Sequence, residues 1–329
     1  MGSRVAQSVQ RDASLDWLRG VLVVGVLLIH ARMLSGTTIE MPVGYLVLAL
    51  NGVIVPVFFG VSGLLACHTL NRPWATFFRA QWQRLVWPYL VWLVIGMFFS
   101  VHVIHEWSLS KDVLVDAVLR PSRVTTAWYL WYAAVFAVIA KLVRRLPRYL
   151  VPAVLGAAMG GGLLTAGEVP AVLIAATSFF IGVECARSGW REVAERHLPL
   201  RVVAGVALAL ALTVLLTWTA VTNEEVLWDG WASLVTLVVV ASALLVVGAF
   251  QPPVSPVVQY LGRHSIILYV AHWPVMLTVM VWRDRASLTP GVCFTLMLST
   301  ALAVCVVACR GSSRYAVVKT LFEWPRRRR

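Results

Sequence analysis

The chain has little charge, and this scarcity is the first guide to its class. Only 13% of its 329 residues are charged, whereas 60% are hydrophobic and the mean hydropathy is +0.80. Soluble domains carry about twice that share of charged residues and do not show long apolar windows from end to end. No internal repeat, low-complexity tract or segment resembling a separate soluble domain interrupts these windows. The composition therefore predicts a polytopic integral membrane protein.

Cysteine is also scarce, which argues against a disulfide-stapled fold. The cysteines are odd in number and have no metal-ligand spacing with histidine; they are Cys67, Cys185, Cys293, Cys305 and Cys309. We expect small core residues, because they lie in or near apolar windows. The first apolar window follows a basic leader and runs on to Arg32 without a small-residue cleavage site, so we expect a retained helix rather than a signal peptide.

Ten apolar windows are long enough to cross about 30 Å of hydrocarbon. They are residues 15–36, 43–66, 85–104, 126–143, 149–166, 170–186, 201–221, 231–250, 265–282 and 291–309. The predicted fold class is all-α, with about ten transmembrane helices in a single domain over 1–329 that ends in a basic tail over 310–329. The pair 149–166 and 170–186 is alternatively one broken hairpin.

The positions of the basic residues predict the orientation. With a cytoplasmic N-terminus, 22 of the 28 Lys and Arg fall on the inner side, which places both termini in the cytoplasm. The formal charge of +13 is thus spread over inner loops and the tail, with no basic domain to hold a duplex. We therefore expect the lipid bilayer as a partner, with the tail on anionic lipid, and no nucleic acid.

Two ionisable residues share one face of the first predicted helix. Arg19 and His30 are three turns plus about 20° apart, so both leave the same face about 16 Å apart along the axis, and Asp16 falls within about 40° of that stripe. Placing an arginine at a helix centre costs about 2.5–3.5 kcal/mol on insertion scales, so such groups usually face a protein interior with a task. An imidazole titrates near about 6.5, and we expect His30 to be a general base. Alternatively, it only bonds neighbouring helices.

Two more polar residues are predicted near the depth of His30. His272 lies nine residues beyond Arg263 in the ninth window, and Asn51 lies eight residues inside the predicted outer end of the second window, 43–66. Both could converge with His30 on one cavity, with Asn51 stabilising an oxyanion. Each also has a simpler interpretation as a hydrogen-bonding residue between helices.

A cationic patch is predicted at the inner end of the third window. Arg79 and Arg84, with Arg72, are suited to binding phosphates, although an orientation signal alone would also explain them. Pro88 has no N–H, so the carbonyl of Arg84 loses its helical partner and we expect the helix to bend there.

Two further motifs have structural explanations. Ser62 beside Gly63 in FFGVSG (58–63) is expected to let helix backbones approach closely, and no base is placed beside Ser62 by spacing to support an acyl-enzyme. The aromatic cluster WYLWY (128–132) is interpreted as a belt at the outer interface.

Several segments together resemble the acyltransferase 3 family of polytopic membrane acyltransferases. In the family's order, these segments are LDWLRG (15–20) followed by His30, FFGVSG (58–63), RLVWPY (84–89), WYL (128–130) and LGRHSIILYVAHWPV (261–275). The chain departs from the family at Gln81, where a second arginine is expected three residues before Arg84, unless Arg79 substitutes for it.

The resemblance implies transfer of an acyl group from a coenzyme A thioester to a hydroxyl of a glycan or small-molecule acceptor, such as a sugar or natural product. Acetyl-CoA is the expected donor, no metal is expected, and a bacterial inner (plasma) membrane is the expected location. The residues expected to hold the donor phosphates are Arg19, Arg84 and Arg79. Those expected at the reaction centre are His30, Asp16, Asn51 and His272.

Two alternatives stay open at this point. A transporter or flippase for a lipid-linked or hydrophobic small molecule also suits many spans with buried polar residues. It would show inverted repeats and broken helices in matching halves, and the hairpin at 149–186 has no obvious twin. A related scaffold that runs other membrane chemistry on a prenyl or polyketide substrate is the second alternative.

Overall fold

The computed structural model describes residues 12–36, 42–100, 111–147, 150–160, 169–222, 230–249 and 255–325, and every element in these ranges is a helix. Eight of the described helices are long and apolar enough to cross a membrane. They are α1 (Ala13–Ser35), α2 (Pro42–Leu70), the continuous stretch Trp74–Phe99, α8 (Val169–Arg187), α10 (Leu198–Thr222), α11 (Gly230–Ala249), α13 (Ser265–Ala286) and α14 (Pro290–Arg314). The prediction of an all-α polytopic membrane protein is confirmed.

Shorter helices complete the described fold. Two of them, α6 (Trp128–Leu142) and α7 (Leu150–Gly160), coincide with the remaining predicted windows, and the outer parts of windows 85–104 and 149–166 lie outside the described residues. The others are α5 (Lys111–Leu119), α9 (Trp190–Arg196), α12 (Pro256–Arg263) and α15 (Ala316–Thr320). Of the predicted tail, residues 326–329 lie outside the described part, whereas α14 continues through Arg314.

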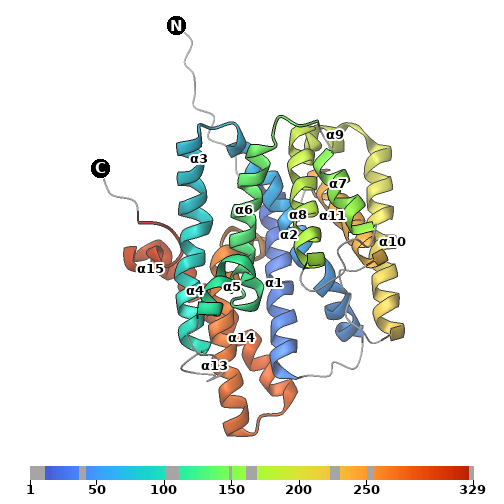
Figure 1. Ribbon diagram of the computed structural model, residues 1–329. Coiled ribbons are helices and arrows are strands. Elements are labelled where there is room, and N and C mark those ends of the chain that lie inside the picture. Colours follow the sequence, from blue (N-terminus) through green and yellow to red (C-terminus); the bar gives the residue numbers. More distant parts are fainter. Residues whose placement is uncertain are drawn as a thin grey trace.

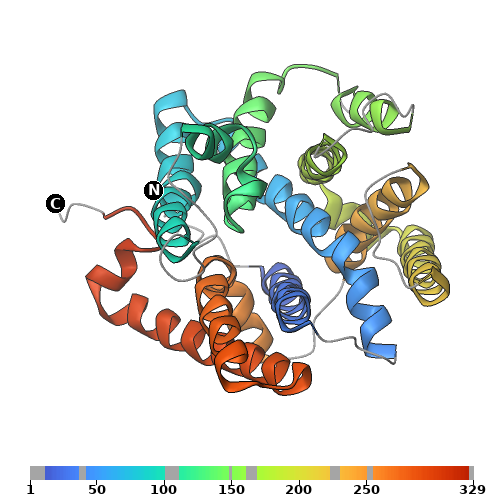
Figure 2. The ribbon, with the colours of Figure 1, turned by 60° about the horizontal axis from the view of Figure 1, so that its bottom comes forward.

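Helix α1 lies at the centre of the bundle (Figures 1 and 2) and contacts α2, α11, α12, α13 and α14. Asp12 caps its first turn by accepting hydrogen bonds from the N–H groups of Ser14 and Leu15 at 3.0 and 3.2 Å. Gly36, with a φ of 65°, ends the helix in the left-handed conformation that glycine adopts without strain. A residue on α1 is therefore held by packing on several sides.

Glycines let the helix backbones touch at two crossings. A Cβ on Gly262 of α12 would lie 1.6 Å from the carbonyl oxygen of Asp16, and one on Gly20 would lie 2.1 Å from the carbonyl oxygen of Val258. At the α2–α8 crossing, a Cβ on Gly63 would lie 1.8 Å from the carbonyl oxygen of Phe179. The close approach predicted at Gly63 is confirmed, and small residues are what such membrane-helix contacts need.

The third span contains a π-helical turn over Trp82–Val86 between α3 (Trp74–Gln81) and α4 (Trp87–Phe99). The N–H of Trp87 donates to the carbonyl of Trp82, five residues back. Because Pro88 has no N–H, the α-helical hydrogen bond to the carbonyl of Arg84 cannot form, and a π turn is one way a helix absorbs that loss. The helix is thus distorted beside Arg84 by a π turn, whereas the predicted bend stays a prediction.

The aromatic cluster at 128–132 makes contacts within the protein. Tyr129 forms a hydrogen bond with Ser62 of α2, and the indole N–H of Trp131 donates to the carbonyl of Val118 at 3.0 Å. The hydroxyl of Tyr89 on α4 donates to the carbonyl of Ala117, so α5 folds back against α4 and α6 and lies at mid-height of the bundle in Figure 1. Tyr129 and Trp131 thus have protein partners, and the interpretation of the cluster as an interfacial belt stays a prediction.

The cysteines behave as core residues. Cys293, Cys305 and Cys309 are buried along one face of α14, together with Met297 and Ala301. Cys67 and Cys185 are half-buried, and none of the five cysteines forms a disulfide. The expectation of small core residues is confirmed for the three cysteines of α14, and no disulfide framework joins the five.

Candidate active site

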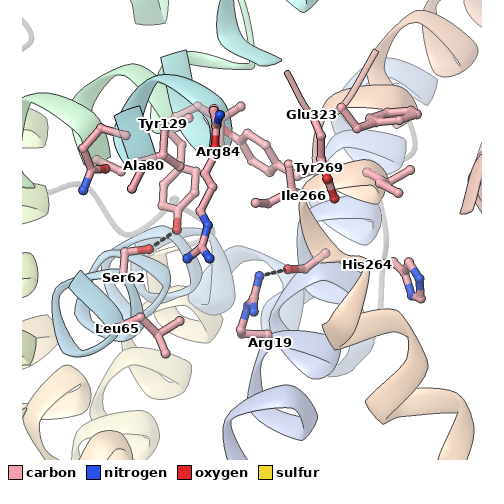
Figure 3. A pocket seen from close by; sticks show the side chains of 18 of the residues that line it. Arg19, Ser62, Leu65, Ala80, Arg84, Tyr129, His264, Ile266, Tyr269 and Glu323 are labelled. Atoms are coloured by element: carbon pink, nitrogen blue, oxygen red, sulfur yellow. Dashed lines mark hydrogen bonds between the residues drawn. The ribbon is translucent and has the colours of Figure 1, made fainter. Parts of the chain in front are cut away.

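A cavity of about 590 Å³ lies between α1, α2, the π turn, α6 and the junction of α12 with α13 (Figure 3). Among the described residues, the cationic side chains that line it are Arg19, Arg84, Arg263 and Lys319, and the one acidic side chain that lines it is Glu323. Four cations against a single carboxylate make this cavity attractive to an anion. Phosphate groups are the ligands that clustered arginines bind best.

The two predicted arginines, Arg19 and Arg84, face the cavity from different helices. Nη2 of Arg19 donates to the hydroxyl of Ser265, the first residue of α13, at 2.8 Å. In Figure 3 the guanidinium of Arg84 points into the same space from the π turn. No carboxylate in the described part of the chain forms an ion pair with Arg84, which leaves its charge available to a ligand.

Hydroxyl groups form the opposite wall. Ser62 bonds to the hydroxyl of Tyr129, whose ring lies 5.3 Å from that of Tyr269, and Tyr269 in turn donates to the carbonyl of Thr126. The partner of Ser62 is a phenol rather than an imidazole. This geometry lacks the adjacent base that an activated serine nucleophile needs.

The two predicted histidines meet. Nδ1 of His30 lies 2.7 Å from Nε2 of His272, and the rings are nearly parallel, with an interplanar angle of 7° and centroids 5.0 Å apart. Nδ1 of His272 lies 3.0 Å from the carbonyl oxygen of Leu268, one helical turn back. His272 is completely buried, whereas His30 is half-buried with Trp273 edge-on to its ring at 5.2 Å.

These distances assign the protons of the pair. Because a carbonyl oxygen only accepts hydrogen bonds, Nδ1 of His272 carries the proton that faces Leu268. Nε2 of neutral His272 is then an acceptor, and His30 donates to it from Nδ1. The remaining nitrogen of His30, Nε2, is left with a lone pair and is free to take a proton.

The prediction that Arg19 and His30 share one face of α1 is confirmed, because both side chains contact α13. The histidine pair is not part of the cavity wall. Tyr269 lines the cavity, and its ring centroid lies 6.2 Å from that of His272. Tyr269 therefore connects the cavity wall to the histidine pair.

Two other predicted site residues lie on α1 and α2. Asp16 is buried near the start of α1, about 21 Å along the axis from His30, where its carbonyl faces Gly262. Asn51 is half-buried on α2, one turn before Ile54, which packs against Gly25 of α1. The depth of Asn51 and the roles of Asp16 and Asn51 stay predictions.

Arg79 does not join Arg19 and Arg84. It is exposed on α3 and lines a second cavity of about 620 Å³, which is mostly apolar and lies between α3, the π turn and α6. Gln81 lines both cavities, so the position where the family carries an arginine does border the first one. That Arg79 substitutes for the arginine expected at position 81 stays a prediction. The placement of Arg79 at the second cavity does not favour it.

Sequence reasoning missed several residues of the cavity wall. Arg263 and His264 stand within LGRHSIILYVAHWPV, the segment that also supplied His272, so the motif itself was an available signal. Tyr129 was available as part of the WYL element. No local signal pointed to Lys319 and Glu323, which reach the cavity from beyond α14.

Comparison with known proteins places this geometry in context. A family model described as an acyltransferase domain matches residues 12–310, nearly the whole chain. The matched range contains every predicted site residue together with Tyr129, Arg263 and Tyr269. Neither the curated proteins nor the solved structures gave a match.

Proposed function

The chain belongs to the acyltransferase 3 family of membrane acyltransferases, and from this premise we propose that it moves an acyl group from acyl-CoA to an acceptor hydroxyl with His30 as the general base. The observation that carries the proposal is the 2.7 Å hydrogen bond between His30 and the fully buried His272. It holds one imidazole nitrogen unprotonated inside a membrane domain. A catalytic base needs that state.

The reaction follows from the assigned protons. Nε2 of His30 takes the proton of the acceptor hydroxyl as the oxygen attacks the thioester carbonyl and a C–O bond forms. The imidazolium created on His30 keeps donating from Nδ1 to His272, which stabilises the charge while it lasts. The C–S bond then breaks, and the leaving thiolate takes the proton back from His30, so the products are the ester and free coenzyme A.

The cavity supplies the donor site in this proposal. The phosphates of the donor are held by Arg19 and Arg84 with help from Arg263, and the pantetheine arm extends along α1 toward His30. Arg19 and His30 are about 16 Å apart along the helix axis, so the two ends of one extended molecule engage different parts of the chain. Acetyl-CoA is the proposed donor, and Asn51 is the candidate to stabilise the oxyanion.

The acceptor approaches the half-buried side of His30. We infer a hydroxylated glycan or small molecule, and a plasma membrane as the location, because a polytopic enzyme with cations on its predicted inner side would meet cytosolic acyl-CoA there. A site with little water also suppresses hydrolysis of the thioester.

The test uses purified protein in lipid nanodiscs, with acetyl-CoA, candidate acceptors and a thiol reagent that reports free coenzyme A. We expect thiol release that requires an acceptor, with product mass increased by one acetyl group. His30→Ala should abolish transfer while the protein melts at the same temperature. Substantial turnover by folded His30→Ala would remove His30 from the mechanism. Substrate flux into proteoliposomes without thioester cleavage would instead favour transport.

A further inference from the structure

The segment after α14 turns back onto the bundle. Tyr315, with an extended backbone at φ −115° and ψ 122°, ends α14, and the short helix α15 follows. Two tryptophans of α4 donate their indole N–H groups to this segment. Trp87 donates to the carbonyl of Thr320 at 2.7 Å, and Trp92 donates to that of Leu321 at 3.0 Å. Figure 2 shows the red segment bending from the end of α14 toward the teal helix.

The π turn provides the docking point for the end of this segment. Because the N–H of Trp87 bonds to Trp82, the carbonyl of Gln83 is released from its α-helical partner, and it accepts from the backbone N–H of Trp324 at 3.5 Å. The ring of Trp324 packs edge-on against Trp87 at 4.6 Å and against Trp82 at 5.9 Å. The segment is therefore attached through backbone and aromatic contacts together.

This segment lies beyond the part of the chain that the family model matches, which ends at residue 310. Four of its side chains nevertheless line the cationic cavity; they are Lys319, Phe322, Glu323 and Trp324. Phe322 is buried and stacks on Trp92 at 5.5 Å, which fixes the backbone between the two charged residues. Nζ of Lys319 lies 3.7 Å from a carboxylate oxygen of Glu323.

We propose that residues 315–324, which we call the strap, complete the donor site, with Lys319 binding an anionic group of the donor and Glu323 opposing it. The inference rests on the proposed function for the identity of the donor, but the anion site itself does not depend on it. In the free protein Glu323 is the partner of Lys319. A phosphate that enters the cavity takes the place of this carboxylate as the partner.

The two charges of the strap then have effects of opposite sign. Removing the charge of Lys319 weakens anion binding, and removing that of Glu323 strengthens it, because a carboxylate in the wall repels phosphate. Both side chains are about half exposed, so each effect is expected to be about two- to five-fold in Kd. Raising the ionic strength should shrink both effects.

The experiment measures binding of coenzyme A and, separately, of inorganic pyrophosphate to the full chain in nanodiscs by calorimetry. The variants are Lys319→Gln, Glu323→Gln and, as a matched control, Arg314→Gln, which removes an exposed charge of α14 that does not line the cavity. We expect weaker binding, tighter binding and no change, respectively. In a Trp324→Ala background, which removes the ring contacts of the strap with Trp82 and Trp87, Lys319→Gln should have a smaller effect than in the wild type.

The outcomes separate this inference from the proposed donor. If coenzyme A binds but Lys319→Gln and Glu323→Gln leave its Kd unchanged, the strap proposal is overturned and the donor stands. If only pyrophosphate binds and the two variants shift its Kd in opposite directions, the strap stands and the donor is wrong. Failure of the wild type to bind either anion overturns both.

Discussion

Replacing His272 by its two amide analogues tests the proton assignment directly. His272 makes two hydrogen bonds, from Nδ1 to Leu268 at 3.0 Å and from Nε2 to His30 at 2.7 Å. The amide of Asn ends at the position of Nδ1, so His272→Asn keeps only the bond to Leu268. The amide of Gln ends at the position of Nε2, so the oxygen of His272→Gln can still accept from His30.

The magnitude follows from the burial of this bond. Without an acceptor, the N–H of His30 loses its partner, at a cost of about 1–3 kcal/mol, and the imidazolium of the reaction loses a charge-assisted bond of similar worth. Each 1.36 kcal/mol is about ten-fold in rate. We therefore expect kcat to fall about 10- to 100-fold in His272→Asn, whereas His272→Gln should stay within about ten-fold of wild type. KM for the donor should change little, because the residues proposed to hold its phosphates, Arg19 and Arg84, are not altered.

The assay is acceptor-dependent thiol release with both substrates varied, and thermal unfolding in nanodiscs checks that each variant is folded. A wild-type kcat in folded His272→Asn would refute the reasoning. So would a His272→Gln enzyme as slow as the Asn variant at equal stability.

Three further predictions concern packing and the donor cavity. Gly262→Ala places a Cβ 1.6 Å from the carbonyl oxygen of Asp16 and should lower the free energy of unfolding by about 1–3 kcal/mol in denaturant titrations. The control Gly205→Ala, with no neighbour within 4 Å, should be neutral or slightly stabilising. Equal denaturation midpoints of the two variants would contradict the packing argument. Arg84→Gln should raise KM for acyl-CoA about ten-fold in steady-state assays with little change in kcat, and an unchanged KM would exclude Arg84 from the donor site. Ser62→Ala should keep kcat within about three-fold of wild type, because the partner of Ser62 is a phenol and not a base that could activate a nucleophile. An acyl-enzyme burst that is seen in the wild type and lost in this variant would contradict this expectation.

Local features of the sequence predicted the parts of the site that depend on one helix. The 3.6-residue period places Arg19 and His30 on one stripe wherever α1 packs, and both do contact α13. Pro88 removes a specific backbone donor, so a distortion beside Arg84 follows from covalent structure alone. Neither prediction required knowledge of which helices are neighbours.

The rest depends on neighbours that are distant in sequence. His30 and His272 are 242 residues apart, and their hydrogen bond depends on how α1 and α13 are placed against each other. The bond between Tyr129 and Ser62 was missed for a related reason, since an aromatic run indicates amphipathic character but not which polar group a ring will contact. Lys319 reaches the cavity from a strap that is held by Trp87 and Trp92 of α4 and by the carbonyl of Gln83 at the π turn.

Tyr269 is the side chain on which the link between the two halves of the proposed site depends. Its ring lines the cavity, the ring centroid lies 6.2 Å from that of His272, and its hydroxyl donates to the carbonyl of Thr126. Tyr269→Phe keeps the ring and loses only the hydroxyl, whereas Tyr269→Ala removes the ring, and we expect this to open the cavity toward the imidazoles. Water then reaches a thioester beside His30, so Tyr269→Ala should release thiol without acceptor about ten-fold faster than wild type.

The ratio of thiol released to ester formed is the measurement that decides this. We expect a ratio near that of wild type for Tyr269→Phe and a clearly higher one for Tyr269→Ala, at comparable thermal stability. An unchanged ratio in folded Tyr269→Ala would mean that the thioester does not pass this ring. Because Tyr269 lines the donor cavity and its ring lies next to His272, that result would separate the cationic cavity from the chemistry of His30 and refute the route along α1.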